Sequence, residues 1–195
     1  SGIGDSEKIK NQGIDVVHEL KGVGKNLQDH LMFRPVYKLK NIKSLNRDIE
    51  SLYSKFLMGL QYILKQSGPI TMGASQVCAF TKSDPSRATP NLQFHVQPLS
   101  TDILGVTPMH DFEGITPTVA NIRPTSRGEI NITSNDSRDN PKIKMNYLST
   151  EDDRIVAAKS LKLVRKIMLE TETFKKYQPE EYRPGVHITD DEELV

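Results

Sequence analysis

Apolar and polar residues alternate with a period of two in several stretches of this chain, the pattern that indicates β-strands. The clearest case is residues 92–97, where Leu92 and Phe94 share one face. The opposite face is polar and consists of Gln93, His95 and Gln97. Similar patterns predict strands at residues 33–39, 75–82, 115–122 and 129–133, a strand at 143–147 that completes a hairpin across the turn at 134–141, and an extended segment at 14–17.

A period of three to four predicts two long helices. In residues 49–65 apolar side chains recur at this spacing, and Gly68-Pro69 ends the helix. In residues 150–170, Ser149 or Thr150 caps the helix and acidic residues fill its first turn. The predicted buried stripe of this second helix is Ala157, Leu161, Val164 and Met168. A short helix capped by Asp5 or Ser6 is also expected to end at Gly13.

These elements predict an α+β domain, a mostly antiparallel β-sheet of about six strands backed by helices. Residues 1–31 are punctuated by glycines and contain too few apolar side chains for a core of their own. We therefore interpret residues 1–31 as loops and a linker that belong to a neighbouring domain, and residues 32–195 as the domain itself. Residues 99–112 are expected to form a loop inside it.

The composition excludes several classes of function. The chain has 26 Lys and Arg against 25 Asp and Glu, so charge provides no reason to expect a nucleic acid or an anionic membrane as a partner. With one cysteine, Cys78, it can form neither an intramolecular disulfide nor a multi-thiolate metal site. The five histidines are scattered, so no metal site is predicted. Cys78 lies in an apolar strand and is expected to be a buried, inert thiol.

Two groups of residues are candidates for chemistry. The polar face Gln93, His95 and Gln97, joined by Gln76 of the preceding strand, either faces solvent or lines a cavity for a small molecule. The small residues from Ser1 to Asp5 either form a tight turn or offer backbone N–H groups to an anion at a helix N-terminus. The pair Gly22 and Gly24 is no dinucleotide fingerprint, because the third glycine is missing.

One segment carries a family resemblance. Gly22-Val23-Gly24-Lys25-Asn26-Leu27-Gln28-Asp29-His30 resembles the G-V-G-x-N-L-x-D-H stretch of the glucose–methanol–choline (GMC) oxidoreductases, which are FAD-dependent alcohol oxidases and dehydrogenases. Further segments match family motifs in the same order along the chain: Ser1-Gly2-Ile3-Gly4, Arg123 with Pro124-Thr125-Ser126-Arg127-Gly128, Asn140-Pro141 through Tyr147, and Pro184-Gly185-Val186 with Thr189-Asp190-Asp191-Glu192.

The resemblance implies which residues contact the cofactor and which parts of the enzyme lie elsewhere. The FAD-contacting residues would be Ser1, Gly2, Gly4, Asn26, Leu27, Asp29 and His30. The glycine-rich motif that binds the ADP part of FAD would precede Ser1, and the catalytic histidine would follow Val195. The chain would thus contain no catalytic residue, would be inactive alone and would not hold FAD by itself. Its partner would be the FAD-binding domain of the same polypeptide.

The resemblance also implies an activity. The intact enzyme, which would be choline dehydrogenase-like, would oxidise a CH–OH group and transfer hydride to FAD, with Gln76, Gln93, His95 and Gln97 as substrate-binding residues. Choline-oxidising members have a glutamate where this chain has Gln76. A neutral glutamine would attract a cation less strongly, which favours a neutral alcohol over choline as substrate. The expected location is cytoplasmic or peripheral to the inner membrane.

Two other interpretations remain open. The chain could be a stand-alone small-molecule-binding or protein-interaction module without catalysis. A domain that is catalytic by itself, with His95 as base, has little support, because no nucleophile or cofactor motif accompanies that residue.

Overall fold

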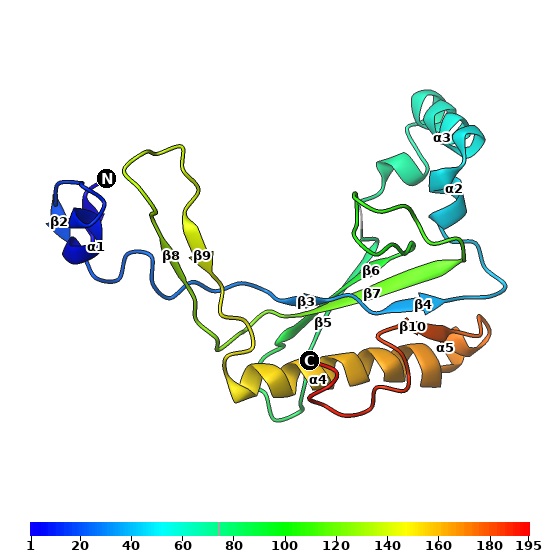
Figure 1. Ribbon diagram of the computed structural model, residues 1–195. Coiled ribbons are helices and arrows are strands. Elements are labelled where there is room, and N and C mark those ends of the chain that lie inside the picture. Colours follow the sequence, from blue (N-terminus) through cyan, green and yellow to red (C-terminus); the bar gives the residue numbers. More distant parts are fainter. Residues whose placement is uncertain (74) are drawn as a thin grey trace. The chain divides into compact units, whose positions relative to one another are not determined.

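The computed structural model describes residues 1–73 and 75–195, which form two compact units. One unit combines residues 1–31 with residues 123–154. The other combines residues 32–122 with residues 155–195 and contains the main sheet, which we call the sheet unit (Figure 1). We call the first the hairpin unit, and each unit is described by itself.

The sheet unit is built on a six-stranded sheet whose paired strands are all antiparallel, as the sequence predicts. The order is β10-β4-β7-β6-β5, with β3 also pairing with β7. The strands are β3 (Met32–Phe33), β4 (Val36–Lys38), β5 (Val77–Thr81), β6 (Leu92–Gln97), β7 (Gly114–Asn121) and β10 (Glu180–Arg183). The strand predicted at 33–39 is interrupted around Pro35, which has no N–H to donate to a ladder. The polar strand β10 shows no alternation and was not predicted.

Helix α4 (Glu151–Arg165) covers one face of the sheet and continues as a π-helical turn, η2 (Lys166–Glu170), before α5 (Glu172–Lys175) (Figure 1). The predicted stripe of Ala157, Leu161, Val164 and Met168 is buried. Val164 and Met168 join Leu92, Phe94 and Val119 in the core cluster. The face of β6 that carries Leu92 and Phe94 therefore packs toward the helix, and the polar face points away from it.

A buried ion pair connects the end of α4 to strand β10. Arg165 donates through Nε and Nη2 to the two oxygens of Glu181, at 2.9 and 2.8 Å. Tyr37 of β4 donates its hydroxyl to Glu181 Oε2 at 3.1 Å, and Gly185 N–H donates to Oε1 at 3.0 Å. Burial, followed by the charge of Glu181, raises the pKa of Tyr37 well above its usual value. This network links α4, two strands and the loop after β10.

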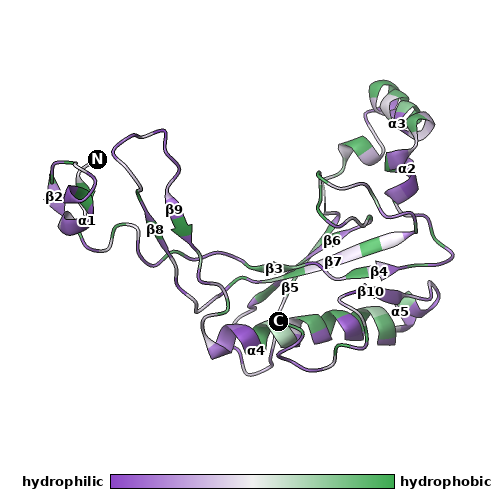
Figure 2. Cartoon of the chain, in the orientation of Figure 1, coloured by the Kyte–Doolittle hydropathy of each residue, from purple (hydrophilic) through white to green (hydrophobic). Residues whose placement is uncertain are grey.

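The helix predicted at 49–65 is divided by Ser51 into α2 (Asn46–Glu50) and α3 (Leu52–Lys65), followed by a 3₁₀ turn, η1 (Pro69–Thr71). Ser51 is extended and caps α3 by accepting a hydrogen bond from Ser54 N–H. Although α3 is strongly apolar (Figure 2), none of its residues is buried. Its exposed apolar side chains are Leu52, Tyr53, Phe56, Leu57, Leu60, Tyr62, Ile63 and Leu64. No helix in the described part of the chain combines the length and apolarity of a membrane span.

The hairpin unit contains short elements only: β1 (Ile3–Gly4), α1 (Ser6–Lys10), β2 (His18–Glu19), β8 (Glu129–Asn131) and β9 (Lys142–Lys144). Asp5 caps α1, one of the two caps that the sequence indicates. Strands β8 and β9 form the predicted hairpin. The extended segment expected at 14–17 is displaced to β2, which pairs in parallel with β1. Gly128 N–H and C=O both bond to Leu27, so the hairpin is joined to the N-terminal segment.

Candidate functional site

The sheet face that points away from α4 brings the predicted substrate-binding residues together. Gln93, His95 and Gln97 of β6 lie on it by alternation. Gln76 directly precedes β5, and its N–H bonds to Val96 O at 3.0 Å, which places it beside Gln97 in the ladder. His95 lies opposite Cys78 of β5 and Thr118 of β7. We call this surface the polar sheet face.

Two residues on the polar sheet face escaped the sequence analysis. Arg34 lies between β3 and β4, and its Nη2 donates to Gln97 Oε1 at 3.0 Å. Extending the β3–β7 register places Arg34 opposite Thr118. The hydroxyl of Thr118 is fully buried and has no hydrogen-bond partner among the described residues. The two-residue period places Arg34 on one face with Val36, and Thr118 on one face of its own predicted strand, but it does not show that the two strands are neighbours.

Cys78 is exposed, and the prediction of a buried thiol is wrong. The reason is its place in the sheet: β5 is an edge strand, and Cys78 points to the polar sheet face rather than to the core. Its sulfur accepts a weak hydrogen bond from Gln93 Nε2 at 3.5 Å. The apolar composition of this strand therefore did not indicate burial.

The loop between β6 and β7 is fixed at one end of the sheet by Asn46, the first residue of α2. Asn46 is completely buried and donates to Ser100 Oγ, His110 O and Phe112 O at 2.9, 3.1 and 2.7 Å. Its Oδ1 accepts from Ser100 N–H at 2.7 Å. His110 in turn contacts Ser100 Oγ and Asp102 Oδ1, both at 3.1 Å. A buried amide with all these bonds satisfied holds the loop in one position.

An aromatic cluster beside this loop surrounds an internal cation. His110 stacks on Phe112 with ring centroids 4.8 Å apart, and Tyr182 lies edge-on to both. The ammonium of Lys38 lies 5.2 Å from the Phe112 ring and 4.9 Å from the Tyr182 ring. Glu180 Oε1 is 3.8 Å from the same nitrogen. The cation–π position that these rings offer is thus taken by the chain's own lysine.

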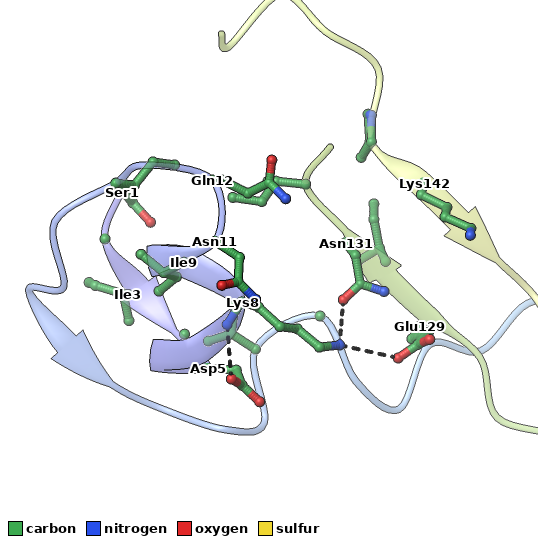
Figure 3. A pocket seen from close by; sticks show the side chains of 18 of the residues that line it. Ser1, Ile3, Asp5, Lys8, Ile9, Asn11, Gln12, Glu129, Asn131 and Lys142 are labelled. Carbon is green, nitrogen blue, oxygen red and sulfur yellow. Dashed lines mark hydrogen bonds and ion pairs between the residues drawn. The ribbon is translucent and has the colours of Figure 1, made fainter. Parts of the chain in front are cut away.

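The hairpin unit contains a cavity of about 670 Å³ between the N-terminal segment and the β8–β9 hairpin (Figure 3). Ser1, Gly2 and Gly4, three of the predicted FAD contacts, line it. Lys8 reaches across to Asn131 Oδ1 at 2.7 Å and to Glu129 at 3.6 Å. Hydrogen bonds from Lys25 and Asn131, with the charges of Lys25 and Lys8, lower the pKa of Glu129 to about 2.

The N-terminus of α1 is not open to an anion. Asp5 Oδ1 accepts from the N–H groups of Glu7 and Lys8, both at 3.2 Å. Ser6 N–H donates to Glu19 Oε2 at 3.1 Å. Because the chain's own carboxylates occupy these donors, the structure favours the tight-turn interpretation of Ser1 to Asp5. That Ser1, Gly2 and Gly4 contact a cofactor stays a prediction.

The other predicted FAD contacts, Asn26, Leu27, Asp29 and His30, do not line this cavity. Asn26, Asp29 and His30 are exposed, and Asn26 adopts a left-handed conformation with φ of 59°. Asp29 accepts hydrogen bonds from Tyr147 Oη at 2.5 Å and from His30 N–H at 2.8 Å, and these lower the pKa of its carboxyl group. The two hydrogen bonds fix the direction of the 26–30 segment while its side chains stay accessible.

No cluster of three or more metal-ligating side chains occurs within residues 1–73 and 75–195. On the polar sheet face the donors and acceptors are mostly neutral amides, an imidazole and hydroxyls, together with the charged Arg34 and, toward the β10 edge, the Lys38–Glu180 pair. Such a set can bind and orient a small polar molecule.

Comparison with known proteins gives three consistent results. Residues 124–195 match the GMC oxidoreductase family. The whole chain is 37% identical to an oxygen-dependent choline dehydrogenase from Photobacterium profundum and 34% identical to one from Chromohalobacter salexigens, each over 194 residues. Each alignment covers 100% of this chain but 34% of the choline dehydrogenase, so the chain spans about a third of the length of these relatives.

Solved structures share the fold. A formate oxidase structure superimposes with a TM-score of 0.87 at 21% identity, covering all of this chain and 38% of that protein. Pyridoxine 4-oxidase from Mesorbium loti superimposes with a TM-score of 0.75 at 20% identity, covering all of this chain and 34% of that protein.

Proposed function

We propose that this chain, which matches the GMC oxidoreductase family over residues 124–195, forms the substrate-binding part of a longer FAD-dependent enzyme that oxidises an alcohol. The observation that carries the proposal is the polar sheet face, where Gln76, Gln93, His95 and Gln97 gather on the side of the sheet opposite α4. The choline dehydrogenases that align over the full chain support the reaction class.

The residues of this face would bind and orient the alcohol. A glutamine amide both donates and accepts hydrogen bonds, so it can hold a hydroxyl group in either role. The Asn46 network keeps the neighbouring loop rigid, which matters because a reacting group tolerates little displacement. FAD, when bound, supplies the hydride acceptor.

The residues of the 26–30 segment would contact the edge of FAD rather than form its main binding site. Asn26, Asp29 and His30 are accessible, and Tyr147 and Leu27 hold their segment in place. Within the described residues there is no glycine-rich strand–turn–helix for a dinucleotide phosphate. We therefore assign the main FAD site to the part of the enzyme outside this chain.

The test compares the complete polypeptide with residues 1–195 produced alone. The complete polypeptide is expected to be yellow, and an alcohol is expected to bleach its flavin absorbance under anaerobic conditions. Residues 1–195 alone should be colourless. A complete polypeptide without flavin, or one whose flavin no alcohol reduces, would contradict the proposal, and a flavin-loaded 1–195 chain would contradict the assignment of the main FAD site. Small-molecule binding by residues 1–195 without any redox activity of the complete polypeptide would favour a non-catalytic module.

A further inference from the structure

We propose that Arg34 makes the polar sheet face selective for alcohols that carry further oxygen acceptors, namely hydroxyl or carboxylate groups, and against alcohols that carry a quaternary ammonium. The inference rests on the proposed function, since it names the substrate class of that same face.

Arg34 is a half-buried cation that has no counter-charge among the described residues. Its Nη2 donates to the neutral amide of Gln97, which is 6% exposed. In the described part of the chain no carboxylate lies within ion-pair distance of its guanidinium. Burial lowers the pKa of Arg34 from its usual value near 12.5, which leaves the group charged at neutral pH. A guanidinium has five N–H donors, so several remain for a ligand.

The strand positions around Arg34 carry no negative charge that could offset it. Besides Lys38 near the edge, the residues on the same sheet face as Arg34 are, by register, amides, hydroxyls, an imidazole, a thiol and apolar groups, some of them buried. They are Met32, Val36, Gln76, Cys78, Phe80, Gln93, His95, Gln97, Thr116, Thr118 and Ala120. At the edge of the sheet, the carboxylate of Glu180 lies beside Lys38. A cation placed near Arg34 would meet a like charge and no attracting carboxylate on these strands.

The clustered rings of Phe112 and Tyr182 do not compensate. A quaternary ammonium is commonly bound by aromatic faces. The Phe112 and Tyr182 rings already hold the Lys38 ammonium at 5.2 and 4.9 Å. An external cation would have to displace an internal one that is also paired with Glu180.

The hydroxyl of Thr118 is an independent sign that this place suits oxygen acceptors. It lies between Arg34 and His95 in the register and is buried without a partner. A buried hydroxyl without a hydrogen bond is unfavourable, and native structures rarely leave one so. A substrate oxygen that reaches Arg34 by displacing side chains above Thr118 would provide the missing acceptor.

The size of the effect follows from Coulomb's law. Two like charges about 6 Å apart at an effective dielectric constant of about 20 repel enough to change a binding ratio by roughly 10- to 100-fold, after allowance for screening. The relevant comparison is choline against its carbon isostere, in which carbon replaces the ammonium nitrogen, because the two differ in charge and hardly in shape.

The experiment measures kcat/KM of the complete flavoenzyme for choline, its carbon isostere, glycerol and glycolate. The wild type is expected to favour the isostere over choline by about 10- to 100-fold. Arg34→Met should reduce this ratio at least about tenfold and should raise KM for glycerol or glycolate, whereas Arg34→Lys should keep the ratio. Arg138→Met is the charge-matched control, since Arg138 is exposed and paired with Asp136, and it should change nothing.

The outcomes separate the two proposals. If no alcohol reduces the flavin, the proposed function fails, and this inference fails with it. If alcohols do reduce the flavin but the wild type prefers choline to its isostere, or Arg34→Met leaves the ratio unchanged, only the inference on Arg34 is overturned. A preference for glycolate would show pairing with a carboxylate, and a preference for glycerol would show hydrogen bonding to hydroxyls; both support the inference.

Discussion

The buried ion pair between Arg165 and Glu181 should be among the most sensitive sites of the sheet unit. The perturbation is Glu181→Gln, which preserves volume and removes the negative charge. Glu181 is fully buried and accepts hydrogen bonds from Arg165, Tyr37 and Gly185. The substitution leaves the Arg165 guanidinium, largely buried itself, without its counter-charge.

Removal of one partner of a buried ion pair typically costs about 3–5 kcal/mol. Two acceptors survive for Arg165, the carbonyls of Ile188 and Gly185 at 2.7 and 3.0 Å, so we expect the lower half of that range. At about 1.4 kcal/mol per factor of ten, amides in this region should exchange with solvent roughly 100- to 1,000-fold faster. The mechanism is easier local opening of β10 and the loop after it.

The assay is hydrogen exchange of the complete polypeptide, followed by mass spectrometry of peptides that cover residues 180–188. Glu180→Gln is the matched control, because the side chain of the neighbouring Glu180 is 65% exposed. Its Oε1 forms a long ion pair of 3.8 Å with Lys38 Nζ. An exposed pair of this kind contributes about 0–1 kcal/mol. Equal exchange in the two variants would refute the reasoning. Combining Arg165→Met with Glu181→Leu should restore much of the protection, since an apolar pair avoids the stranded charge.

Three further predictions concern other positions. Gly128→Ala would place a Cβ 2.2 Å from Lys144 O, so we expect loss of the β8–β9 pairing, seen as faster proteolysis of this hairpin, and unchanged proteolysis would contradict it. Asn46→Ala should cost about 2–3 kcal/mol because it leaves buried groups such as Ser100 N–H unpaired; an unchanged melting temperature would disprove this. Burial alone would raise the pKa of Asp153, but its hydrogen bonds outweigh burial and lower the pKa. The ionised Asp153 therefore stabilises the fold at pH values above about 3.9, the pKa of an aspartate in the unfolded chain. This stabilisation is lost as the pH falls through the lower pKa that Asp153 has in the folded protein. The destabilisation by Asp153→Asn, measured by denaturant titration, should shrink toward acidic pH, and a pH-independent difference would count against it.

Local patterns predicted the elements whose side chains meet the core directly. Residues 92–97 form β6 with the expected bounds, because one face must be buried and a slip by one residue would expose it. The stripe of α4 is buried for the same reason. The amphipathic pattern of α3 correctly predicted a helix. An apolar stripe does not show which surface packs against it, and in this structure no residue of α3 is buried.

Non-local pairing was beyond the sequence patterns. Strand β10 is polar, and its place is set by pairing with β4 and by the buried Glu181. The association of residues 123–154 with residues 1–31 depends on backbone bonds between Gly128 and Leu27, which no periodicity encodes. On the polar sheet face the three residues of β6 could be grouped from alternation alone. Arg34 could not be added without knowing that its strand lies beside β7.

The hairpin unit is assembled from two segments of chain separated by residues 32–122. During synthesis the first segment leaves the ribosome long before its partner exists, so residues 1–31 cannot form the Leu27–Gly128 pairing until residues 32–122, which contain every strand of the main sheet except β10, have been translated. Until then, this glycine-rich stretch lacks its partner hairpin, β8 and β9. Any product terminated before residue 123 would leave residues 1–31 in that condition, and we expect such products to be quickly degraded in the cell.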